Sequence, residues 1–268
     1  MSQIHLLDAQ TANSIAAGEV VERPASVVKE LVENALDAGA SVVTVEIRQG
    51  GIRLIRVMDN GGGMDAEDAR LAFDRHATSK LVRIEDLDKL LTMGFRGEAL
   101  ASIAAVAQVT LETCQLGETE GSRIRIAGGE ILEQTTAACA AGTSIQVENL
   151  FFNVPARFKF LKKDTTEAGQ ITDLLQRLAL ARPDVSFRLV SNGQNILHTP
   201  GNNDLSSAVY AVYGKQTAQA CLPIQSKTEL LLLTGVVVRP DLNRNSRDQQ
   251  SFFVNGRLVR SKVMTAAL

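Results

Sequence analysis

The chain has 268 residues, of which 45% are hydrophobic, and this is enough to bury a sizeable core in one large folded unit or two smaller ones. Its 28 lysines and arginines face 30 aspartates and glutamates, and the formal charge of −2 excludes a global electrostatic attraction to nucleic acid. No window reaches the ~18 apolar residues of a membrane span and no signal peptide is visible, so we expect a soluble, cytoplasmic protein without membrane contact.

Helical and strand patterns alternate along the chain, as is typical of an α+β domain. The first predicted helix begins at Pro24, which suits an early helical position, and ends at Gly39, a common left-handed cap. A hairpin follows, with strands over residues 41–48 and 52–58. The pattern then predicts helices over 66–73, 98–106 and 166–181, strands over 122–127, 131–134 and 143–148, and a hairpin that turns at Asn192-Gly193.

A turn-rich stretch over residues 199–204 predicts a domain boundary. We therefore predict one domain over residues 1–204 and the start of a second over 205–268. The second part is predicted to hold a short helix over 205–213, an apolar strand over 230–238, and a hairpin with strands over 251–254 and 258–260. The chain ends within an unfinished element after Lys262, so we expect this second domain to be truncated.

The first candidate motif lies on the predicted helix that begins at Pro24. A rotation of 100° per residue places Glu30, Asn34 and Asp37 within about 60° of one another, with apolar residues opposite. For an isolated helix, an ordinary solvated face explains this pattern. As a functional site, the Glu30 carboxylate can orient and deprotonate an attacking water, and the Asn34 amide oxygen suits Mg²⁺.

The second candidate motif, residues 59–64, comes directly after an apolar strand and reads Asp-Asn-Gly-Gly-Gly-Met. The Asp59 carboxylate can accept a hydrogen bond from an exocyclic amine at the floor of a pocket. The glycines permit a close approach of the backbone to a ligand. A simple β-turn is the alternative interpretation of this segment.

The third candidate motif, Gly94-Phe-Arg-Gly97, leads into a predicted helix, and backbone N–H groups at a helix start bind phosphate well. A glycine-punctuated helix start without a ligand is the alternative. The segment 75–80 offers hydroxyls and a cation, and it is a candidate lid over phosphates. No Gly-x-x-x-x-Gly-Lys-Ser/Thr sequence occurs, which excludes a P-loop.

The cysteines, the histidines and three other polar residues give no clear indication of a functional site. The three cysteines match neither a disulfide framework nor a zinc spacing, and we interpret them as buried thiols. The three histidines assemble no metal site or catalytic triad. Without a structural context, Glu33, Glu98 and Thr143 do not stand out from the residues around them.

Taken together, the motifs Glu-x-x-Asn-x-x-Asp-Ala, Asp-x-Gly-x-Gly-Met and Gly-x-x-Gly resemble those of the gyrase, Hsp90, histidine kinase and MutL ATPase superfamily. Residues 15–30, 75–80 and 94–103 are similar to the MutL family of DNA mismatch-repair proteins, and residues 150–157 and 252–257 extend this resemblance over essentially the whole chain. A histidine kinase or a gyrase subunit is the alternative. The resemblance implies a Bergerat-type two-layer sandwich of a mixed, mostly antiparallel sheet with helices on one face, followed by part of an S5-like transducer domain.

The resemblance also implies a role for each motif residue, with ATP and Mg²⁺ as cofactors. Glu30 is implied as the general base, Asn34 as the Mg²⁺ ligand and Asp59 as the carboxylate that reads adenine. The nucleotide pocket, phosphate region and lid are implied to comprise a larger set: Asp37, Ala38, Gly63, Met64, Thr78, Ser79, Lys80, Arg96, Gly97, Glu98, Ala99, Leu100 and Thr143.

The function implied by the resemblance is that of a slowly hydrolysing ATP switch in DNA mismatch repair. Nucleotide binding would order the lid and promote a homodimer of the N-terminal regions, coupling a mismatch-recognition protein to a downstream nuclease and helicase. A nucleotide-gated interaction module, with hydrolysis only as a reset, is the alternative to an enzyme. The lysine that relatives send to the γ-phosphate has no matching position, so we expect impaired hydrolysis, and we expect no nuclease site in these residues.

Two basic clusters are candidate contacts to the DNA backbone. One comprises Arg157, Lys159, Lys162 and Lys163, and the other comprises Arg257, Arg260 and Lys262. Such side chains meet phosphates without reading bases. Ordinary solvated surface charge is the alternative interpretation.

Overall fold

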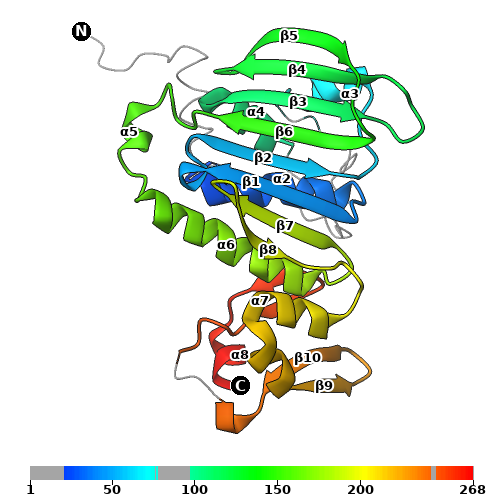
Figure 1. Cartoon of the computed structure of the whole chain (residues 1–268), viewed down its shortest axis with the longest axis vertical. Coiled ribbons are helices and arrows are strands. Elements are labelled where there is room, and N and C mark those ends of the chain that lie inside the picture. The colour runs from blue at the N-terminus through cyan, green and yellow to red at the C-terminus, as the bar shows by residue number, and fades with distance from the viewer. Residues whose placement is uncertain (1–20, 76, 78–96, 243–245, 268) are drawn as a thin grey trace.

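The computed structural model of the chain describes residues 21–75, 77, 97–242 and 246–267. The elements up to residue 198 are α2 (Pro24–Asp37), β1 (Val42–Arg48), η1 (Gln49–Gly51), β2 (Leu54–Asp59), α3 (Ala66–Leu71), α4 (Ala99–Val106), β3 (Gln108–Cys114), β4 (Gly121–Ala127), β5 (Glu130–Ala137), β6 (Gly142–Glu148), α5 (Pro155–Phe158), α6 (Asp164–Ala181), β7 (Ser186–Ser191) and β8 (Gln194–His198). The strands form one eight-stranded sheet in the order β5-β4-β3-β6-β2-β1-β7-β8 (Figure 1). Among these strands, β1 and β7 pair in parallel and the other neighbours are antiparallel.

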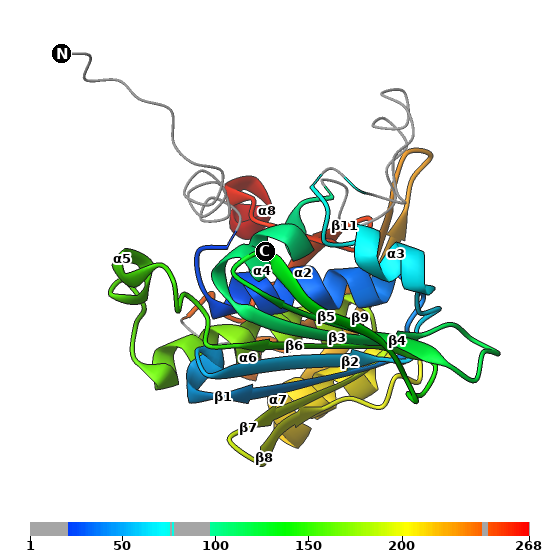
Figure 2. The same cartoon turned by 90° about the horizontal axis from the view of Figure 1, so that it is seen from above.

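Helices cover one face of this sheet, and Figure 2 shows α2 and α4 lying on the same side of it. In β1, Val43 and Val45 are completely buried on the helix side, whereas Thr44 and Glu46 on the other face stay partly exposed. The parallel register places Phe187 of β7 beside Val43, so β7 turns its buried side chains to the same face. The predicted fold class, a two-layer sandwich with a mixed, mostly antiparallel sheet, is confirmed.

Helix α2 lies at the centre of the helical layer. It begins at Pro24 as predicted and ends at Asp37, after which Gly39 adopts a positive φ of 77°. Its apolar side is fully buried against β1, β2 and α6, with Val27, Val28 and Val32 at 0% exposure. The apolar face therefore fixes the rotation of the helix, and the opposite, polar face is left for other contacts.

Strand β3 was not predicted, although it lies between β4 and β6 in the middle of one half of the sheet. Its buried side chains alternate regularly, with Val109, Leu111 and Thr113 inward. The strand begins at Gln108, one residue after the C-cap of α4, so no glycine or proline separates helix from strand. Because no such residue separates the two elements, the alternating pattern of β3 could not be distinguished from the apolar pattern of the preceding helix.

The remaining elements form a smaller part that begins after β8. They are α7 (Leu205–Ala220), β9 (Cys221–Lys227), β10 (Leu232–Val238), η3 (Pro240–Leu242), β11 (Phe252–Val254), β12 (Arg257–Val259) and α8 (Lys262–Ala267). The predicted end of the first of these helices, at residue 213, coincides with a break at Gly214, where φ is 83°, but helical residues resume beyond it. Strand β9 was not predicted and follows α7 directly. The predicted apolar strand is β10, yet Leu232 and Leu233, which point to opposite faces of the two-stranded sheet, are 59% and 48% exposed.

None of the described helices has the length and apolar composition needed to cross a bilayer.

Candidate functional site

The polar face of α2 carries three of the predicted site residues. Lys29 lies beside this face, and its Nζ is 3.2 Å from Glu30 Oε1 and 2.7 Å from Glu33 Oε2. The Glu30 side chain is 28% exposed, so its carboxylate remains accessible to water. Asn34 and Asp37 are half-buried further along the same face. The predicted grouping of Glu30, Asn34 and Asp37 therefore agrees with the helix as it is placed in the fold.

Glu33 belongs to this face and was passed over in the sequence. Burial raises the pKa of the Glu33 carboxyl, and Glu30 and Asp37 act in the same direction against the opposing effect of Lys29. Lys29 links two of these carboxylates, because its Nζ contacts both Glu30 and Glu33. A signal was present in the sequence, since Glu33 follows Glu30 by three residues, which is one of the two same-face spacings of a helix.

Asp59 is the last residue of β2, an interior strand of the sheet, and it is partly buried. Its Oδ1 accepts a hydrogen bond of 2.8 Å from the Gly61 N–H. Burial raises the pKa of the Asp59 carboxyl, although the backbone N–H groups of Gly61 and Thr143 favour its ionised form. An acidic group that is desolvated and still partly exposed is suited to bind a complementary donor from a ligand.

The turn after Asp59 is fastened to α2 on one side and to β3 on the other. The Gly62 N–H donates to the Ala38 carbonyl at 3.0 Å, and the Met64 N–H donates to Thr113 Oγ1 at 2.9 Å. Between them, Gly63 has a φ of 68°, and a Cβ at this position would lie 2.0 Å from the Cys114 carbonyl oxygen. Only glycine fits there. The turn thus joins the C-terminal end of α2 to β3, so the segments of the first two motifs are in contact.

Thr143 on β6 lies next to the same turn. It pairs with Asp59 in the β2–β6 ladder and with Thr113 in the β3–β6 ladder. The Thr113 hydroxyl donates to the Gly142 carbonyl at 3.1 Å and lies 3.1 Å from Thr143 Oγ1. Thr113 is completely buried and connects three parts of the site, but it was missed because its strand was not predicted.

Replacing Thr113 with valine is expected to lower the free energy of unfolding by about 1–3 kcal/mol, because the shape is kept while the Met64 N–H loses its acceptor. Chemical denaturation of the variant measures this loss. Thr110→Val is the matched control, since Thr110 lies on the open face of β3, and its effect should stay within about 0.5 kcal/mol. Equal effects of the two changes would contradict the linking role of Thr113.

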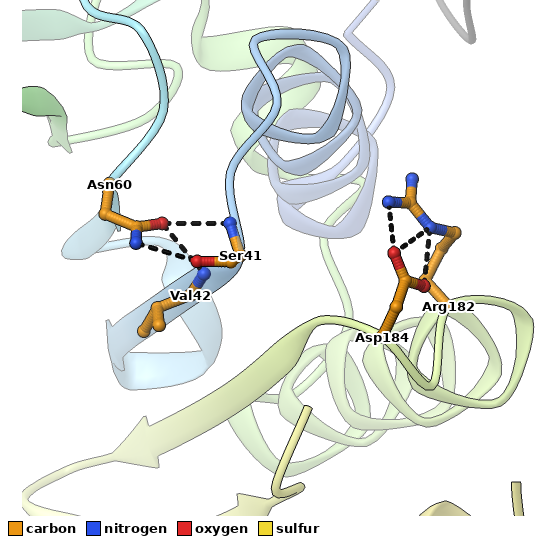
Figure 3. A network of polar contacts seen from close by, with 5 residues as sticks. All are labelled: Ser41, Val42, Asn60, Arg182 and Asp184. Carbon is orange, nitrogen blue, oxygen red and sulfur yellow. Dashed lines mark hydrogen bonds and ion pairs between the residues drawn. The ribbon is translucent and has the colours of Figure 1, made fainter. Parts of the chain in front are cut away.

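Asn60 fixes the other end of the turn to the start of β1, as Figure 3 shows. Its Oδ1 accepts from the Ser41 N–H at 2.9 Å and from the Val42 N–H at 2.8 Å, and its Nδ2 donates to Ser41 Oγ at 2.9 Å. These bonds satisfy backbone groups at the beginning of the strand. Asn60 was quoted only as part of the turn motif, and its partners lie too far away in the sequence to be inferred locally.

The third motif is described only from Gly97 onward. Gly97 has a φ of 61°, Glu98 is the N-cap of α4, and Ala99 and Leu100 form the first turn of that helix, all partly buried. The predicted helix over residues 98–106 therefore agrees with α4. Thr78, Ser79, Lys80 and Arg96 lie outside the described residues.

The first basic cluster lies on α5 and in the residues that lead into α6, whereas the second lies on β12, just after it and at the start of α8. Arg157 on α5 donates to the Val21 carbonyl at 3.3 Å and is partly buried, while the other cluster residues are exposed: Lys159, Lys162, Lys163, Arg257, Arg260 and Lys262. Arg260 faces the first half of α6 across a cleft of about 520 Å³. Arg23 and Arg177, which the sequence did not single out, also line this cleft.

Two family models match parts of this chain. The family model described as histidine kinase-, DNA gyrase B-, and HSP90-like ATPase matches residues 22–150. The model described as DNA mismatch repair protein, C-terminal domain, matches residues 209–268. The first match contains α2, the turn after Asp59, the start of α4 and Thr143.

Relatives that match most or all of the chain identify the family more closely. The MutL protein of Desulforamulus reducens is 51% identical over all 268 residues, and the chain spans 42% of that relative's length. The ATPase domain of Aquifex aeolicus MutL, solved in complex with ADP, is 34% identical with a TM-score of 0.71, over 92% of this chain and 87% of that one. The N-terminal domain of a DNA repair protein is 25% identical with a TM-score of 0.79, over 94% and 80% of the two chains. The chain therefore belongs to the MutL family of DNA mismatch-repair proteins, in the region that forms their ATPase domain.

Proposed function

We propose that this chain is an ATP-binding and slowly ATP-hydrolysing switch of DNA mismatch repair. The observation that carries the proposal is the hydrogen bond from the Gly62 N–H to the Ala38 carbonyl, which joins the helix of Glu30 and Asn34 to the turn that follows Asp59. A nucleotide site needs these groups together, because positioning the ligand and the attacking water relative to each other supplies much of the rate. The ADP complex of the Aquifex aeolicus relative supports the assignment.

Within this site, we assign Asp59 to the exocyclic amine of adenine and Glu30 to the attacking water. The pocket is completed by Asp37, Ala38, Gly63, Met64 and Thr143. The phosphate region and lid comprise Thr78, Ser79, Lys80, Arg96, Gly97, Glu98, Ala99 and Leu100. Backbone N–H groups at the start of α4 favour the negative charge of phosphate there.

Asn34 fits Mg²⁺ as a single protein ligand on the same helix face as Glu30. Within the described ranges, no three acidic, histidine or cysteine side chains gather to hold a metal. A single amide oxygen therefore matches an ion that commonly keeps few protein ligands besides phosphate oxygens and water. When bound, Mg²⁺ neutralises charge on the phosphates. The task of Asn34 is to hold it, and that of Glu30 is to orient the water.

The biological output that we propose is a change of partners. ATP binding would order the lid and promote dimerisation of the N-terminal regions, and the dimer would connect a mismatch-recognition protein with a downstream nuclease and helicase. We assign no nuclease activity to these residues. Light scattering with a non-hydrolysable ATP analogue, beside separate assays of binding and hydrolysis, tests this role. If the chain dimerises when it binds the non-hydrolysable analogue, the result supports a switch driven by nucleotide binding. If it dimerises only while it hydrolyses ATP, the result contradicts that role.

We also propose that the cluster at the start of α6 contacts the DNA backbone. Changing Lys162 and Lys163 to glutamate is expected to weaken binding to duplex DNA and to reduce the slope of log affinity against log salt by about 0.9 for each lost phosphate contact. Acidic residues near a helix N-terminus are favourable, so α6 should persist. The control, Lys215→Glu with Lys227→Glu, changes net charge equally at exposed sites elsewhere. If both double variants lose affinity equally, the effect is one of net charge alone.

A further inference from the structure

Two cysteines meet directly behind the turn that follows Asp59. Cys114 ends β3 and is 1% exposed, whereas Cys139 lies on the segment after β5 and is partly exposed. This corrects the interpretation of all three thiols as buried. Because Thr113 pairs with Ser122, Cys114 lies beside Gly121, the first residue of β4.

Gly121 leaves the space in which the two thiols meet. A Cβ at this glycine would lie 2.4 Å from Cys139 Sγ and 3.0 Å from Cys114 Cβ. The two sulfur-bearing side chains therefore occupy the volume that any other residue would fill. Both cysteines are free thiols, and Cys114 Sγ lies 3.6 Å from the carbonyl oxygens of Gln115 and Glu118.

The chemical state of this pair follows from its surroundings. Burial raises the pKa of the Cys139 thiol, and the neighbouring Cys114 thiol and Glu112 carboxylate act in the same direction. A raised pKa lowers the thiolate fraction, and because the thiolate is the nucleophile, we expect Cys139 to be oxidised faster in alkaline buffer. It is nevertheless the one of the two that solvent reaches.

We propose that Cys114 and Cys139 are a redox-modification site at which a hydroperoxide forms a reversible intrachain disulfide. The Cys139 thiol loses its proton, and the thiolate attacks one oxygen of hydrogen peroxide. The O–O bond breaks, a sulfenic acid forms, and the departing hydroxide takes up that proton and leaves as water. The Cys114 sulfur then attacks the sulfenic sulfur, and the hydroxyl leaves as water with the Cys114 proton. Two thiols are oxidised to one disulfide while hydrogen peroxide is reduced to two waters, and a thiol reductant reverses the bond.

The disulfide would also act on the turn. An S–S bond is only about 2.05 Å long, shorter than any contact between two thiols, so the two side chains must move closer when it forms. We expect the end of β3 and the segment after β5 to shift with them. The Cys114 carbonyl fills the space that a side chain at position 63 would need, and the adjacent Thr113 hydroxyl accepts a hydrogen bond from the Met64 N–H. This second step rests on the proposed nucleotide site, and we expect the oxidised chain to bind ATP roughly tenfold more weakly.

The experiment uses the whole chain with Cys221→Ser, so that only the pair remains. Hydrogen peroxide is added in mildly alkaline buffer, and thiols are counted with a maleimide after denaturation, before and after dithiothreitol. We expect two reactive thiols to fall to none and to return on reduction, with mass spectrometry showing one linked peptide pair two hydrogens lighter. The further change Cys139→Ser should leave the buried Cys114 reactive towards maleimide after denaturation, with no linked peptide.

Two results overturn the proposed bond: both thiols persist through peroxide treatment, or Cys139 reaches a sulfinic or sulfonic acid while Cys114 stays free. ATP affinity is then measured on the reduced and oxidised forms. If the reduced form binds ATP and the oxidised form binds equally well, the coupling to the turn is wrong. If the reduced form binds no ATP, the proposed function fails, while the thiol count still decides the disulfide.

Discussion

Replacing Asp59 with asparagine is expected to weaken ATP binding by at least about 100-fold. Oδ1 of Asp59 accepts from the Gly61 N–H at 2.8 Å, and the amide oxygen of asparagine would take over that bond. The NH₂ group then replaces the second carboxylate oxygen and presents a donor to the amine of adenine, which is also a donor. Isothermal titration with ATP measures the loss.

The same variant should be folded and at least as stable as the parent at neutral pH. Burial raises the pKa of the Asp59 carboxyl in the folded chain above its ordinary value of 3.8. Protonation of Asp59 therefore stabilises the folded chain fully at a pH below 3.8. This contribution is lost as pH rises through the folded pKa, so the ionised carboxylate costs stability at neutral pH. Asparagine carries no charge and avoids the cost. Thermal unfolding in neutral and acid buffers measures the difference, which should be larger in neutral buffer.

A matched control separates the adenine contact from a general loss of acidic charge. Asp241 on η3 is 65% exposed and lies 3.6 Å from Arg239, far along the chain from the site residues. Asp241→Asn should leave ATP affinity unchanged. An Asp59→Asn protein that binds ATP as tightly as the parent would remove Asp59 from the proposed adenine contact.

Glu30→Gln is expected to bind ATP nearly as well as the parent and to hydrolyse it about 10²–10⁴ times more slowly. Glutamine keeps the size of the side chain but cannot take a proton from water. The partly exposed ion pair with Lys29 contributes little to stability, so the fold should persist. Single-turnover release of phosphate, with protein in excess over ATP, measures hydrolysis independently of binding.

Glu46→Gln is the matched control for this change. Glu46 is a glutamate of β1 whose side chain is 22% exposed and lies 3.1 Å from Arg48, on the open face of the sheet. It should turn over ATP at the parental rate. If Glu33→Gln lost turnover while Glu30→Gln retained it, the general base would be Glu33 and not Glu30.

The local features of the site could be predicted because they depend on neighbours in the sequence. The helical period places Glu30, Asn34 and Asp37 on one face, and an apolar strand followed by Asp-Asn-Gly predicts an aspartate at a strand end. The β1–β2 hairpin was predicted from similar short-range signals. Its observed strand boundaries differ from the predicted ones by no more than two residues. The fold class followed from the motif resemblance.

Other features depend on strand order, which local patterns do not encode. The parallel pairing of β1 with β7 joins segments more than a hundred residues apart, and the position of β3 beside β6 brings Thr113 to Thr143. The burial of Glu33 likewise depends on what packs around α2, so the same residue on an isolated helix would be a solvated charge.

By itself, the sequence determined which side chains could form the site, because helical and strand periodicity fix the face on which each residue lies. Only the tertiary structure decided which faces meet: Gly62 against Ala38, Gly63 against Cys114, and Cys114 beside Cys139 at Gly121. Such contacts between distant segments arise from packing of the whole sheet and its helices, and this packing is a collective result of the core.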